Sequence, residues 1–560
     1  MCGIVGYIGQ GDASPFLLKM LSALEYRGYD SAGIATLSES IHIEKKEGSV
    51  SGLKKRPGSI GIGHTRWATH GQPSQVNAHP HLSSDGTIAI VHNGIIENFQ
   101  KLRKSLGVEQ SSETDSEVLA HLIQSHYEGD LLEATRLALL QVKGSFALLV
   151  LSSSHPDQIV VARRHSPLVI GLGEKENFVA SDVPAFLSFT KKAIFLEEDE
   201  IGRLFADKIE LFNLSGERVD RKEKEIEWSV EQAEKRGYDH FMLKEIYEQP
   251  EAIEATLSAL NPIDFKKELY IVACGTSYHA ALLSTPYFAK AGINARPVIS
   301  SEFNMLLPFI SKQSTILAIS QSGETADTLT AVREAKKRGA RIVSITNVVG
   351  STLSRISDET LYTRCGPEIG VAATKTFTSQ VATLLGLTGE LSIDKEFMAD
   401  WIKKVATEVR KASTLISNAE HVFFLGRGQG HALALEAALK LKEISYIHAE
   451  GFAGGELKHG PLALIDDKSW VFAIAPFEEK KMLSSVTEAK ARGAKIISLC
   501  FEGSEFDSLS ESVIEIPKGL GRAEPIFAAI PLQLFAYFSG VDRGINVDKP
   551  RNLAKSVTVE

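Results

Sequence analysis

The residue with the clearest chemical potential is a cysteine in second place. The chain begins MCGIVGYIGQ, so removal of Met1 would leave Cys2 at the N-terminus, directly before a strand-like apolar run. A terminal cysteine supplies a thiolate nucleophile and, in its own α-amine with an ordinary pKa of about 8, a base that accepts the thiol proton. The alternative, a cysteine that packs as a small apolar residue, does not explain the position. We therefore expect covalent catalysis at Cys2.

Polar residues further along the chain are suited to hold a substrate for this nucleophile. Arg66 in HTRWATHG offers a forked donor for a carboxylate, and Trp67 beside it offers a bulky lid. Asn93 and Gly94 follow a predicted strand, where a side-chain amide and a backbone N–H can form an oxyanion hole. Asp115 in SETDSEV is placed to bind an ammonium group, or alternatively to cap a helix.

The histidines and cysteines do not form metal-binding patterns. Five histidines lie between positions 64 and 92, but the segment has no HExxH motif and is broken by proline, so we predict no metal there. The four cysteines lie far apart without a CxxC pair, which argues against a disulfide framework and against a thiolate zinc site. They are Cys2, Cys274, Cys365 and Cys500. A reducing cytoplasm is the location that fits this usage best.

A second candidate site lies in SQSGETADT, where a predicted strand ends and a helix begins. N–H groups at a helix start favour an anion, and three hydroxyls add further donors. No lysine follows the glycine, so the pattern differs from the nucleotide P-loop and indicates a single phosphate, as on a sugar. The alternative is an ordinary helix cap with polar loop residues. The residues are Ser320, Gln321, Ser322 and Thr325, with Thr276 and Ser277 at an equivalent turn after the neighbouring strand.

Charged residues of the second half are candidates for proton transfer and imine chemistry. The residues Glu436, Lys440 and Glu443 share one helical face among Ala, Leu and Ile. Burial of a charge there costs free energy unless the charge is paired or has a catalytic or binding role. A solvated, salt-bridged face is the alternative. His459 follows a glycine-rich turn, a plausible place for an acid or base. Lys555 lies in the weakly polar LAKSVTV; if the tail folds into a pocket, burial frees its amine for a Schiff base.

Two kinds of architecture must position these groups. The first part, to about residue 225, mixes strand-like apolar runs with helical periodicity and predicts an α+β domain of stacked sheets and helices. The second part contains an internal repeat: LYIVACGTSYHAALL and EAKKRGARIVSIT return as VFFLGRGQGHALALEAALKL and EAKARGAKIISLC. Each copy reads as a doubly wound α/β domain with a parallel sheet. The predicted boundaries are 2–225, a connector at 226–240, 241–395, 400–545 and a tail at 546–560.

Composition excludes several classes of function. The 560 residues carry a formal charge of −9 with no long Lys/Arg block, so we predict no nucleic-acid partner. No run reaches about 18 apolar residues, and the start lacks the basic flank of a signal peptide. We therefore expect a cytoplasmic protein without a membrane partner.

The motifs together carry a resemblance that covers the chain from residue 2 to its end. In order they are CGIVGYIG, EYRGYDSAG, HTRWATHG, HNGIIEN, SQSGETADT, ELKHGPLALI and DKPRNLAKSVTVE. This series closely resembles the family of glutamine–fructose-6-phosphate aminotransferases (isomerising). The first half resembles class II glutamine amidotransferases of the N-terminal-nucleophile hydrolase fold, and the second half resembles a pair of sugar isomerase (SIS) domains.

The resemblance implies a role for each candidate residue. Cys2 attacks the glutamine amide, Asn93 and Gly94 stabilise the oxyanion, and Trp67 gates an ammonia channel. Glu443 moves a proton between C1 and C2 of the sugar, His459 assists ring opening and Lys555 forms the imine. Glutamine is bound by Arg66, Thr69, His70 and Asp115, with Arg27 near the nucleophile; fructose 6-phosphate is bound by Thr276, Ser277, Ser320, Gln321, Ser322 and Thr325, with Glu436 and Lys440 lining that site.

The implied reaction converts L-glutamine and D-fructose 6-phosphate to L-glutamate and D-glucosamine 6-phosphate, without metal or organic cofactor, in a homodimer joined through the SIS domains. Another class II amidotransferase would need a pyrophosphate- or ATP-binding half, and a non-catalytic sugar-phosphate sensor would be expected to lack Cys2 or Lys555. The chain looks shorter than typical members around residues 38–60 and at the connector, and Ala373 stands in VAATK where the family has VASTK. These departures bear on regulation and on a minor sugar contact.

Overall fold

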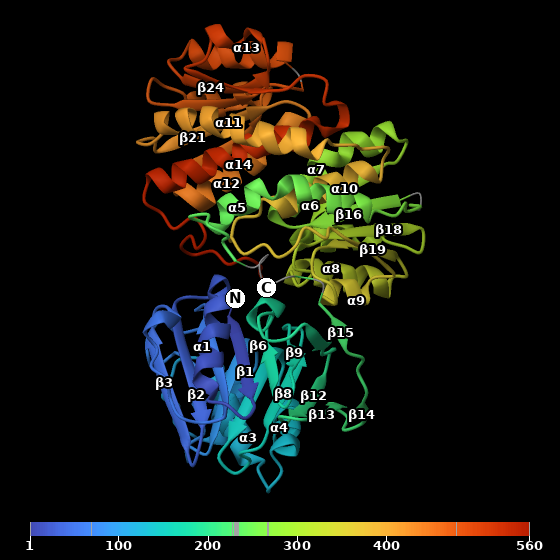
Figure 1. Cartoon of the computed structure of the whole chain (residues 1–560). Coiled ribbons are helices and arrows are strands. Elements are labelled where there is room, and N and C mark those ends of the chain that lie inside the picture. The colour runs from blue at the N-terminus through green and yellow to red at the C-terminus, as the bar shows by residue number, and fades with distance from the viewer. Residues whose placement is uncertain are drawn as a thin grey trace. The chain divides into compact units, whose positions relative to one another are not determined.

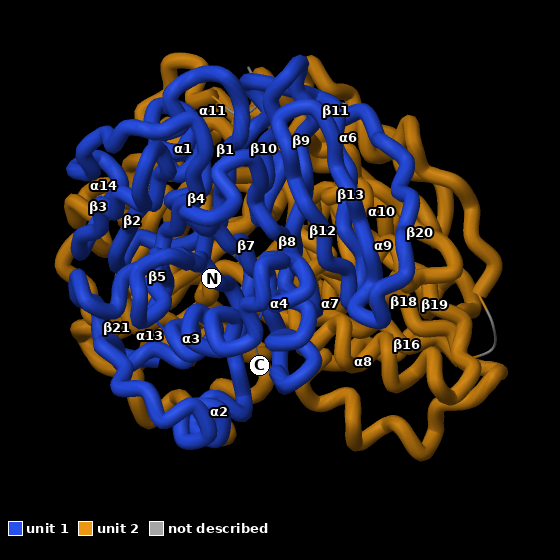
Figure 2. The backbone as a smooth tube through the Cα atoms, turned by 90° about the horizontal axis from the view of Figure 1, so that it is seen from below, with its two compact units in different colours: residues 1–233, 556–560 blue, residues 234–555 orange. Residues whose placement is uncertain are grey.

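The computed structural model describes residues 2–68, 70–226, 228, 234–265, 268–477 and 479–558. It divides into two compact units, shown in blue and orange in Figure 2: unit 1 comprises residues 1–233 and 556–560, and unit 2 comprises residues 234–555. The predicted connector at 226–240 falls partly outside the described residues. Its boundaries, like those of the other predicted domains, remain predictions.

Unit 1 is built from two antiparallel sheets (Figure 1). The eight-stranded sheet has the order β15 (Lys224–Glu225), β11 (Lys192–Phe195), β9 (Val169–Leu172), β10 (Asn177–Ala180), β1 (Gly3–Ile8), β4 (Ile60–Arg66), β2 (Ser31–Leu37) and β3 (Ile41–Glu47). The seven-stranded sheet has the order β14 (Arg218–Val219), β13 (Ile209–Asn213), β12 (Glu200–Leu204), β8 (Ile159–Arg164), β7 (Gly144–Ser152), β6 (Ile88–Ile96) and β5 (His81–Leu82).

The two sheets stack face to face, with helices on their outer faces. Along β6, Ala89 and Val91 join a core shared with Ile4 of β1, whereas Ile88 and Ile90 join a second core with the helices. This alternation follows from the two-residue period of a strand buried on both faces. The helices of unit 1 are α1 (Ala13–Ala23), which contacts β1 and β4, and α2 (Phe99–Leu106), α3 (Glu117–Ser125) and α4 (Leu131–Leu139).

Unit 2 contains two five-stranded parallel sheets with the same strand order, which the internal repeat predicts. The first is β17 (Ala295–Ile299), β16 (Glu268–Ala273), β18 (Ser314–Ile319), β19 (Arg341–Thr346) and β20 (Glu359–Tyr362). The second is β22 (His448–Ala453), β21 (His421–Gly426), β23 (Trp470–Ile474), β24 (Lys495–Phe501) and β25 (Ser512–Ile516). In chain order each sheet is arranged 2-1-3-4-5, a doubly wound order that places ligands beyond the carboxyl ends of the first and third strands.

Helices cover both faces of each sheet. Along β16, Ile271 joins a core shared with the second sheet, while Tyr270 and Val272 join a smaller core beneath α8 and α9. The helices are α5 (Phe241–Tyr247), α6 (Gln249–Ser258), α7 (Gly275–Lys290), α8 (Ala326–Lys337), α9 (Thr352–Ile356), α10 (Lys375–Gly386), α11 (Lys395–Leu415), α12 (Gln429–Ser445), α13 (Glu479–Lys490) and α14 (Glu524–Asp542). The predicted fold class, an α+β domain followed by two doubly wound α/β domains, is confirmed.

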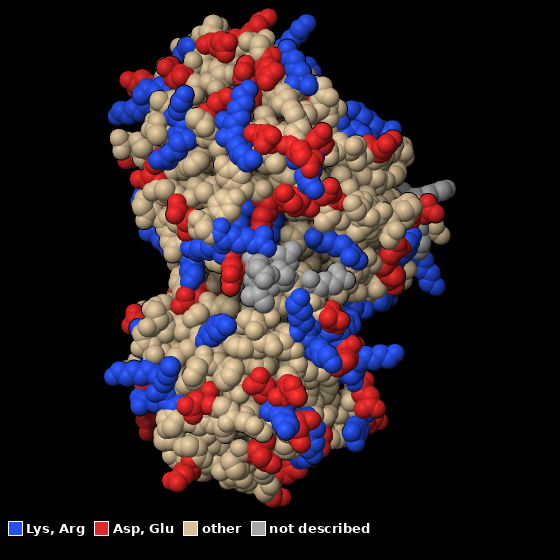
Figure 3. Space-filling view, in the orientation of Figure 1, with Lys and Arg blue, Asp and Glu red and all other residues tan. Residues whose placement is uncertain are grey.

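One segment, Gly521–Asp542, is long and apolar enough to cross a membrane by length and composition alone. Of its most apolar window, 83% is buried inside the protein, because α14 lies in the core shared by the two sheets of unit 2. Its composition is therefore explained by packing. On the face shown in Figure 3, basic and acidic side chains are intermingled over both units, without a concentrated basic patch.

Candidate active sites

Cys2 lies at the start of the central strand of the first sheet, in unit 1. Gly3 of β1 pairs with Thr65 of β4, so Cys2 lies opposite the end of that strand. There the backbone N–H of Trp67 donates to the Cys2 sulfur at 3.2 Å. Burial raises the pKa of the Cys2 thiol, and the Trp67 N–H and the charges of Arg66 and Arg27 oppose that rise. Burial is the larger effect, so the protonated thiol is favoured overall, and the Trp67 N–H and the two arginines limit the rise.

Two side chains converge on the backbone carbonyl of Cys2. The Asn93 amide donates to this oxygen at 2.8 Å, and Nε of Arg27 donates to it at 3.3 Å. Arg27 is held in turn by Asp182, whose carboxylate lies 3.1 Å from the guanidinium and also accepts from the Tyr26 hydroxyl at 2.6 Å. Arg27 and Asn93 therefore lie beside Cys2.

The orientation of the Asn93 amide is set by a buried histidine. Nε2 of His64 lies 3.1 Å from the Asn93 side-chain oxygen and 3.1 Å from the carbonyl of His92. Both partners are acceptors, so Nε2 carries the proton and donates. Burial lowers the pKa of His64 well below its ordinary value, which keeps the ring neutral in that tautomer. The amide nitrogen of Asn93 must then point toward Cys2.

Gly94 occupies a conformation that excludes a side chain. Its φ is +135°, and a Cβ atom there would lie 2.1 Å from the carbonyl oxygen of Ser145 on the paired strand. With this φ and this close approach, only glycine fits in β6 at the position after Asn93. The backbone conformation of β6 therefore explains why glycine follows Asn93 in the sequence.

Two of the predicted glutamine-binding residues, Arg66 and His70, lie at the end of β4 and in the loop that follows it. Arg66 is buried and donates to the carbonyls of His70, Gly71 and Gln72, so its guanidinium holds this loop. The His70 ring packs edge-on against Phe99. Asp115 does not cap α3: its carboxylate accepts from the Ile96 N–H at 2.7 Å. Thr69 lies outside the described residues.

The predicted phosphate turn lies at the carboxyl edge of the first parallel sheet, in unit 2. Ala273 of β16 pairs with Ile319 of β18, so the turns that follow the two strands are neighbours, and each leads into a helix N-terminus, α7 or α8. The Cys274 sulfur after β16 lies 3.9 Å from the hydroxyl oxygen of Thr328 in α8, which connects the two turns. This edge therefore brings together Thr276, Ser277, Ser320, Gln321, Ser322 and Thr325.

Hydroxyls within this turn organise its backbone. Ser320 Oγ lies 2.8 Å from Thr325 Oγ1 and accepts from the Gly323 N–H at 3.0 Å, while Ser322 Oγ accepts from the Glu324 N–H at 3.1 Å. Gly323 has φ +66° and faces Ser351 so closely that a Cβ would lie 2.2 Å from its hydroxyl oxygen. Thr325 is the N-cap residue of α8 but makes no side-chain capping bond.

Glu436 and Lys440 on the charged face of α12 are buried and Glu443 is partly buried, in line with the apolar surroundings in the sequence. Lys440 is 2% exposed, with Nζ 2.6 Å from Glu443 and 3.6 Å from Glu436. Burial opposes its charged form, but Glu443 and Glu436 outweigh this and raise the pKa of Lys440. Glu436 also accepts from the Thr276 hydroxyl at 3.0 Å and contacts His279 Nδ1 at 2.7 Å, which joins α12 to the phosphate turn.

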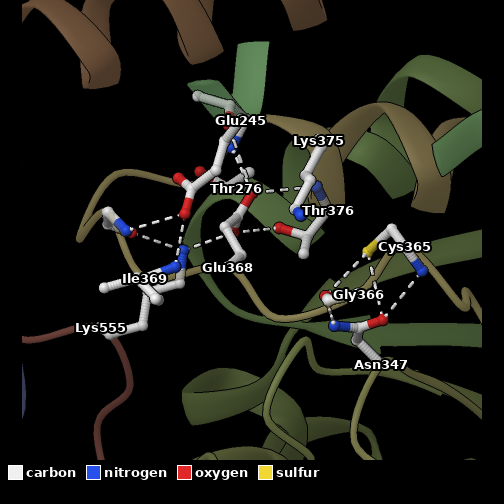
Figure 4. Close-up of polar contacts among 12 residues, drawn as sticks. Glu245, Thr276, Asn347, Cys365, Gly366, Glu368, Ile369, Lys375, Thr376 and Lys555 are labelled. Atoms are coloured by element: carbon white, nitrogen blue, oxygen red, sulfur yellow. Dashed lines mark hydrogen bonds and ion pairs between the residues drawn. The ribbon is translucent and has the colours of Figure 1, made fainter. Parts of the chain in front are cut away.

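Lys555 is buried within unit 2. Its amine is paired with the carboxylate of Glu368 and donates to the Gly370 carbonyl at 2.8 Å (Figure 4). Glu368 also accepts from the backbone and hydroxyl groups of Thr374 and Thr376. Although burial alone would raise the pKa of Glu368, the Lys555 charge and these hydrogen bonds hold it well below its usual range.

One predicted residue lies away from the other candidates, and three residues close to the candidates are not predicted from the sequence. His459 ends the short helix Glu456–His459, is exposed, and among the described residues makes no hydrogen bond or ion pair with the other candidates. His64, Glu368 and Glu245 were not singled out from the sequence. His64 lies in the HTRWATHG motif without a predicted role, and PEIG and KEIY carry no local pattern; only the tertiary structure places His64 beside Asn93 and Glu368 beside Lys555.

Comparison with known proteins shows similarity over the whole chain. The family model described as a glutamine amidotransferase domain matches residues 1–219, and the SIS domain model matches residues 263–388 and 415–539. Glutamine–fructose-6-phosphate aminotransferases [isomerizing] of Caldanaerobacter subterraneus, Aquifex aeolicus and Pyrococcus horikoshii are 45%, 47% and 46% identical, each over 100% of both chains. The solved C-terminal domain of glucosamine-fructose-6-phosphate aminotransferase from Francisella tularensis matches with a TM-score of 0.52 and 38% identity, covering 56% of this chain and 99% of that one.

Proposed function

The chain belongs to the family of glutamine–fructose-6-phosphate aminotransferases (isomerising), and we propose that it converts D-fructose 6-phosphate and L-glutamine to D-glucosamine 6-phosphate and L-glutamate. The observation that carries the proposal is the burial of Lys555 beside Glu368 in a unit whose phosphate turn is built from hydroxyls and two helix N-termini. A glutamine hydrolase alone has no use for such a site.

In the glutamine half, the Cys2 thiolate attacks the amide carbon of glutamine. The C–N bond breaks, ammonia leaves, and water hydrolyses the resulting thioester to release glutamate. Asn93 and Gly94 stabilise the oxyanion, and His64 supports Asn93 by fixing its amide. Removal of Met1 supplies the α-amine that takes the thiol proton. Arg66, Thr69, His70 and Asp115 hold the glutamine.

In the sugar half, the hydroxyls and N–H groups of the turns after β16 and β18 bind the phosphate. The Lys555 amine adds to C2 of the opened ketose and forms an imine with loss of water, which requires that the amine first gives up a proton. Glu443 moves a proton from C1 to C2, and His459 assists ring opening. The ion pair with Glu368 holds the amine in place until the sugar carbonyl arrives.

Before that proton moves, ammonia released at Cys2 adds to C2 of the Lys555 imine and the lysine leaves as a free amine, so that each turnover consumes one glutamine and regenerates the lysine. Ammonia that reached water would be protonated and would lose its nucleophilicity. We assign Trp67, whose N–H contacts the Cys2 sulfur, as the gate that retains it. Assembly as a homodimer through the SIS domains completes the proposal.

A pair of variants tests the proposal by separating its two halves. Cys2→Ala should abolish glutamine-dependent formation of glucosamine 6-phosphate while leaving isomerisation of fructose 6-phosphate to glucose 6-phosphate largely intact. Lys555→Ala should do the reverse and spare glutamine hydrolysis. Loss of both activities in either variant, or glutamine-dependent synthesis by Cys2→Ala, would refute the assignment.

A further inference from the structure

A second buried carboxyl, which the proposed reaction does not use, lies near Lys555. Glu245 on α5 is 1% exposed. Its Oε1 accepts from the backbone N–H groups of Ile369 at 2.5 Å and Gly370 at 3.1 Å. Its Oε2 is buried and has no hydrogen-bond partner among the described residues. Burying a carboxyl with one oxygen unsatisfied costs free energy, so this position calls for a structural explanation.

The short segment that Glu245 holds is the one that holds Lys555. The Gly370 carbonyl accepts from the Lys555 amine at 2.8 Å, and the Glu368 carboxylate pairs with it from the start of the same segment (Figure 4). In segment 368–370, the N–H groups of Ile369 and Gly370 therefore face Glu245, whereas the Glu368 carboxylate and the Gly370 carbonyl face Lys555. Movement of this segment would displace both acceptors of the amine at once.

Close packing leaves the segment little freedom on the side of α5. A Cβ atom added to Gly370 would lie 2.8 Å from Oε2 of Glu245 and 3.4 Å from the Met242 nitrogen. The N–H groups of Phe241 and Met242, at the start of α5, both donate to the Asp548 carboxylate at 2.9 Å, and the Asp548 carbonyl accepts from Val371 at 3.2 Å. The tail that carries Lys555 is thus anchored to α5 and to the end of the same segment.

Charges on three other elements face Glu245. Burial and the Glu368 carboxylate raise the pKa of Glu245, while Lys555 and Lys375 oppose this rise. Lys375 itself pairs with Glu248 at 2.8 Å. Glu245 is thus a largely neutral hydrogen-bonding group beside the Glu368–Lys555 pair. A neutral residue in this place can hold the segment without competing with Glu368 for the lysine.

We propose that Glu245 is a positioning residue for Lys555, which fixes segment 368–370 so that the Gly370 carbonyl and the Glu368 carboxylate aim the amine at the sugar. The inference rests on the proposed imine at Lys555. Glu245 does not touch the sugar in this scheme. It acts through the backbone of Ile369 and Gly370.

Three variants of the full-length chain test this, with Glu251→Ala on the exposed side of α6 as the matched control. Formation of glucosamine 6-phosphate from glutamine and fructose 6-phosphate is measured, together with borohydride trapping of the Lys555 adduct without glutamine as a function of pH. Glu245→Ala should lower kcat by about 10- to 100-fold with KM for fructose 6-phosphate within about threefold of wild type. The pH dependence of trapping should shift, because the neighbours of the amine have moved.

Glu245→Gln keeps an oxygen for both N–H groups and should recover most of the rate, within about fivefold of wild type. Gly370→Ala, which leaves the carboxyl in place but crowds it, should lower kcat as Glu245→Ala does. Wild-type kinetics in Glu245→Ala, a Glu245→Gln variant as slow as Glu245→Ala, or a parallel loss of sugar binding would each overturn the inference. Absence of any trapped adduct at Lys555 in the wild type would instead overturn the imine itself.

Discussion

The side-chain amide of Asn93 donates to the backbone carbonyl of Cys2 at 2.8 Å. The two residues come from different sheets of unit 1, the first from β6 and the second from the start of β1. His64, from β4, determines which way the Asn93 amide faces. A hydrogen-bond donor is therefore fixed beside Cys2 by buried, neutral hydrogen bonds, which is the arrangement that the proposed oxyanion hole requires.

Asn93→Ala should lower kcat for glutamine hydrolysis by about 10²- to 10³-fold, with a smaller change in KM, because the lost donor acts on the oxyanion. Glutamate release is the measurement. Asn98→Ala is the matched control, since the Asn98 side chain donates to the Gln141 carbonyl and accepts from the Lys143 N–H and makes no bond to Cys2 among the described residues. Hydrolysis at the wild-type rate in Asn93→Ala would remove this residue from the oxyanion hole.

Lys555 should be the residue that borohydride traps with fructose 6-phosphate. Reduction of the imine fixes the sugar to Nζ, and peptide mass spectrometry should locate the added mass on Lys555. Lys555→Arg should give no adduct, because a guanidinium keeps its charge in proteins and cannot form the imine. An adduct on another lysine in the wild type would contradict the assignment.

Lys440→Ala should destabilise unit 2 by about 3–5 kcal/mol, because it leaves the buried Glu436 and the partly buried Glu443 without their shared cation. Urea unfolding followed by a probe in unit 2 measures the loss. Lys442→Ala, two residues along on the exposed face of α12, should change the free energy of unfolding by less than about 0.5 kcal/mol. Equal stabilities of the two variants would show that the charged face is not held by Lys440.

The raised pKa of Glu245, about 8, predicts a pH-dependent difference in stability between wild type and Glu245→Gln. Between the unfolded-state value of about 4.3 and the folded value, the folded chain binds one more proton at this site than the unfolded chain does. Stability contributed by Glu245 therefore falls as pH rises through this range. The wild-type melting temperature should decline relative to Glu245→Gln from pH 5 to pH 8; a constant difference would contradict the raised pKa.

Much of the fold could be predicted from local patterns. The repeated strand–turn–helix units become two sheets of identical order, and the spacing of Glu436, Lys440 and Glu443 places all three on one face of α12. Such features depend on periodicity, which the sequence carries directly. The turn after β18 could be placed for the same reason.

The partners of the chemical groups could not be predicted in the same way. Glu368 pairs with Lys555 across 187 residues of the chain, and Glu245 bonds to the neighbouring Ile369 across 124 residues, and neither segment has a distinctive composition. Arg66, a plausible carboxylate ligand from its sequence context, donates to the carbonyls of its own loop. Partner choice is a property of tertiary packing, where burial decides which charges must pair.

The most direct test of the central claim follows the amide nitrogen of glutamine. The purified chain, with loss of Met1 verified by intact mass, is incubated with fructose 6-phosphate and glutamine labelled with ¹⁵N at the amide. We predict glucosamine 6-phosphate that carries the ¹⁵N label, and none from the Cys2→Ala variant. Formation of glutamate and ammonia without labelled amino sugar, or labelled product from Cys2→Ala, would contradict the claim.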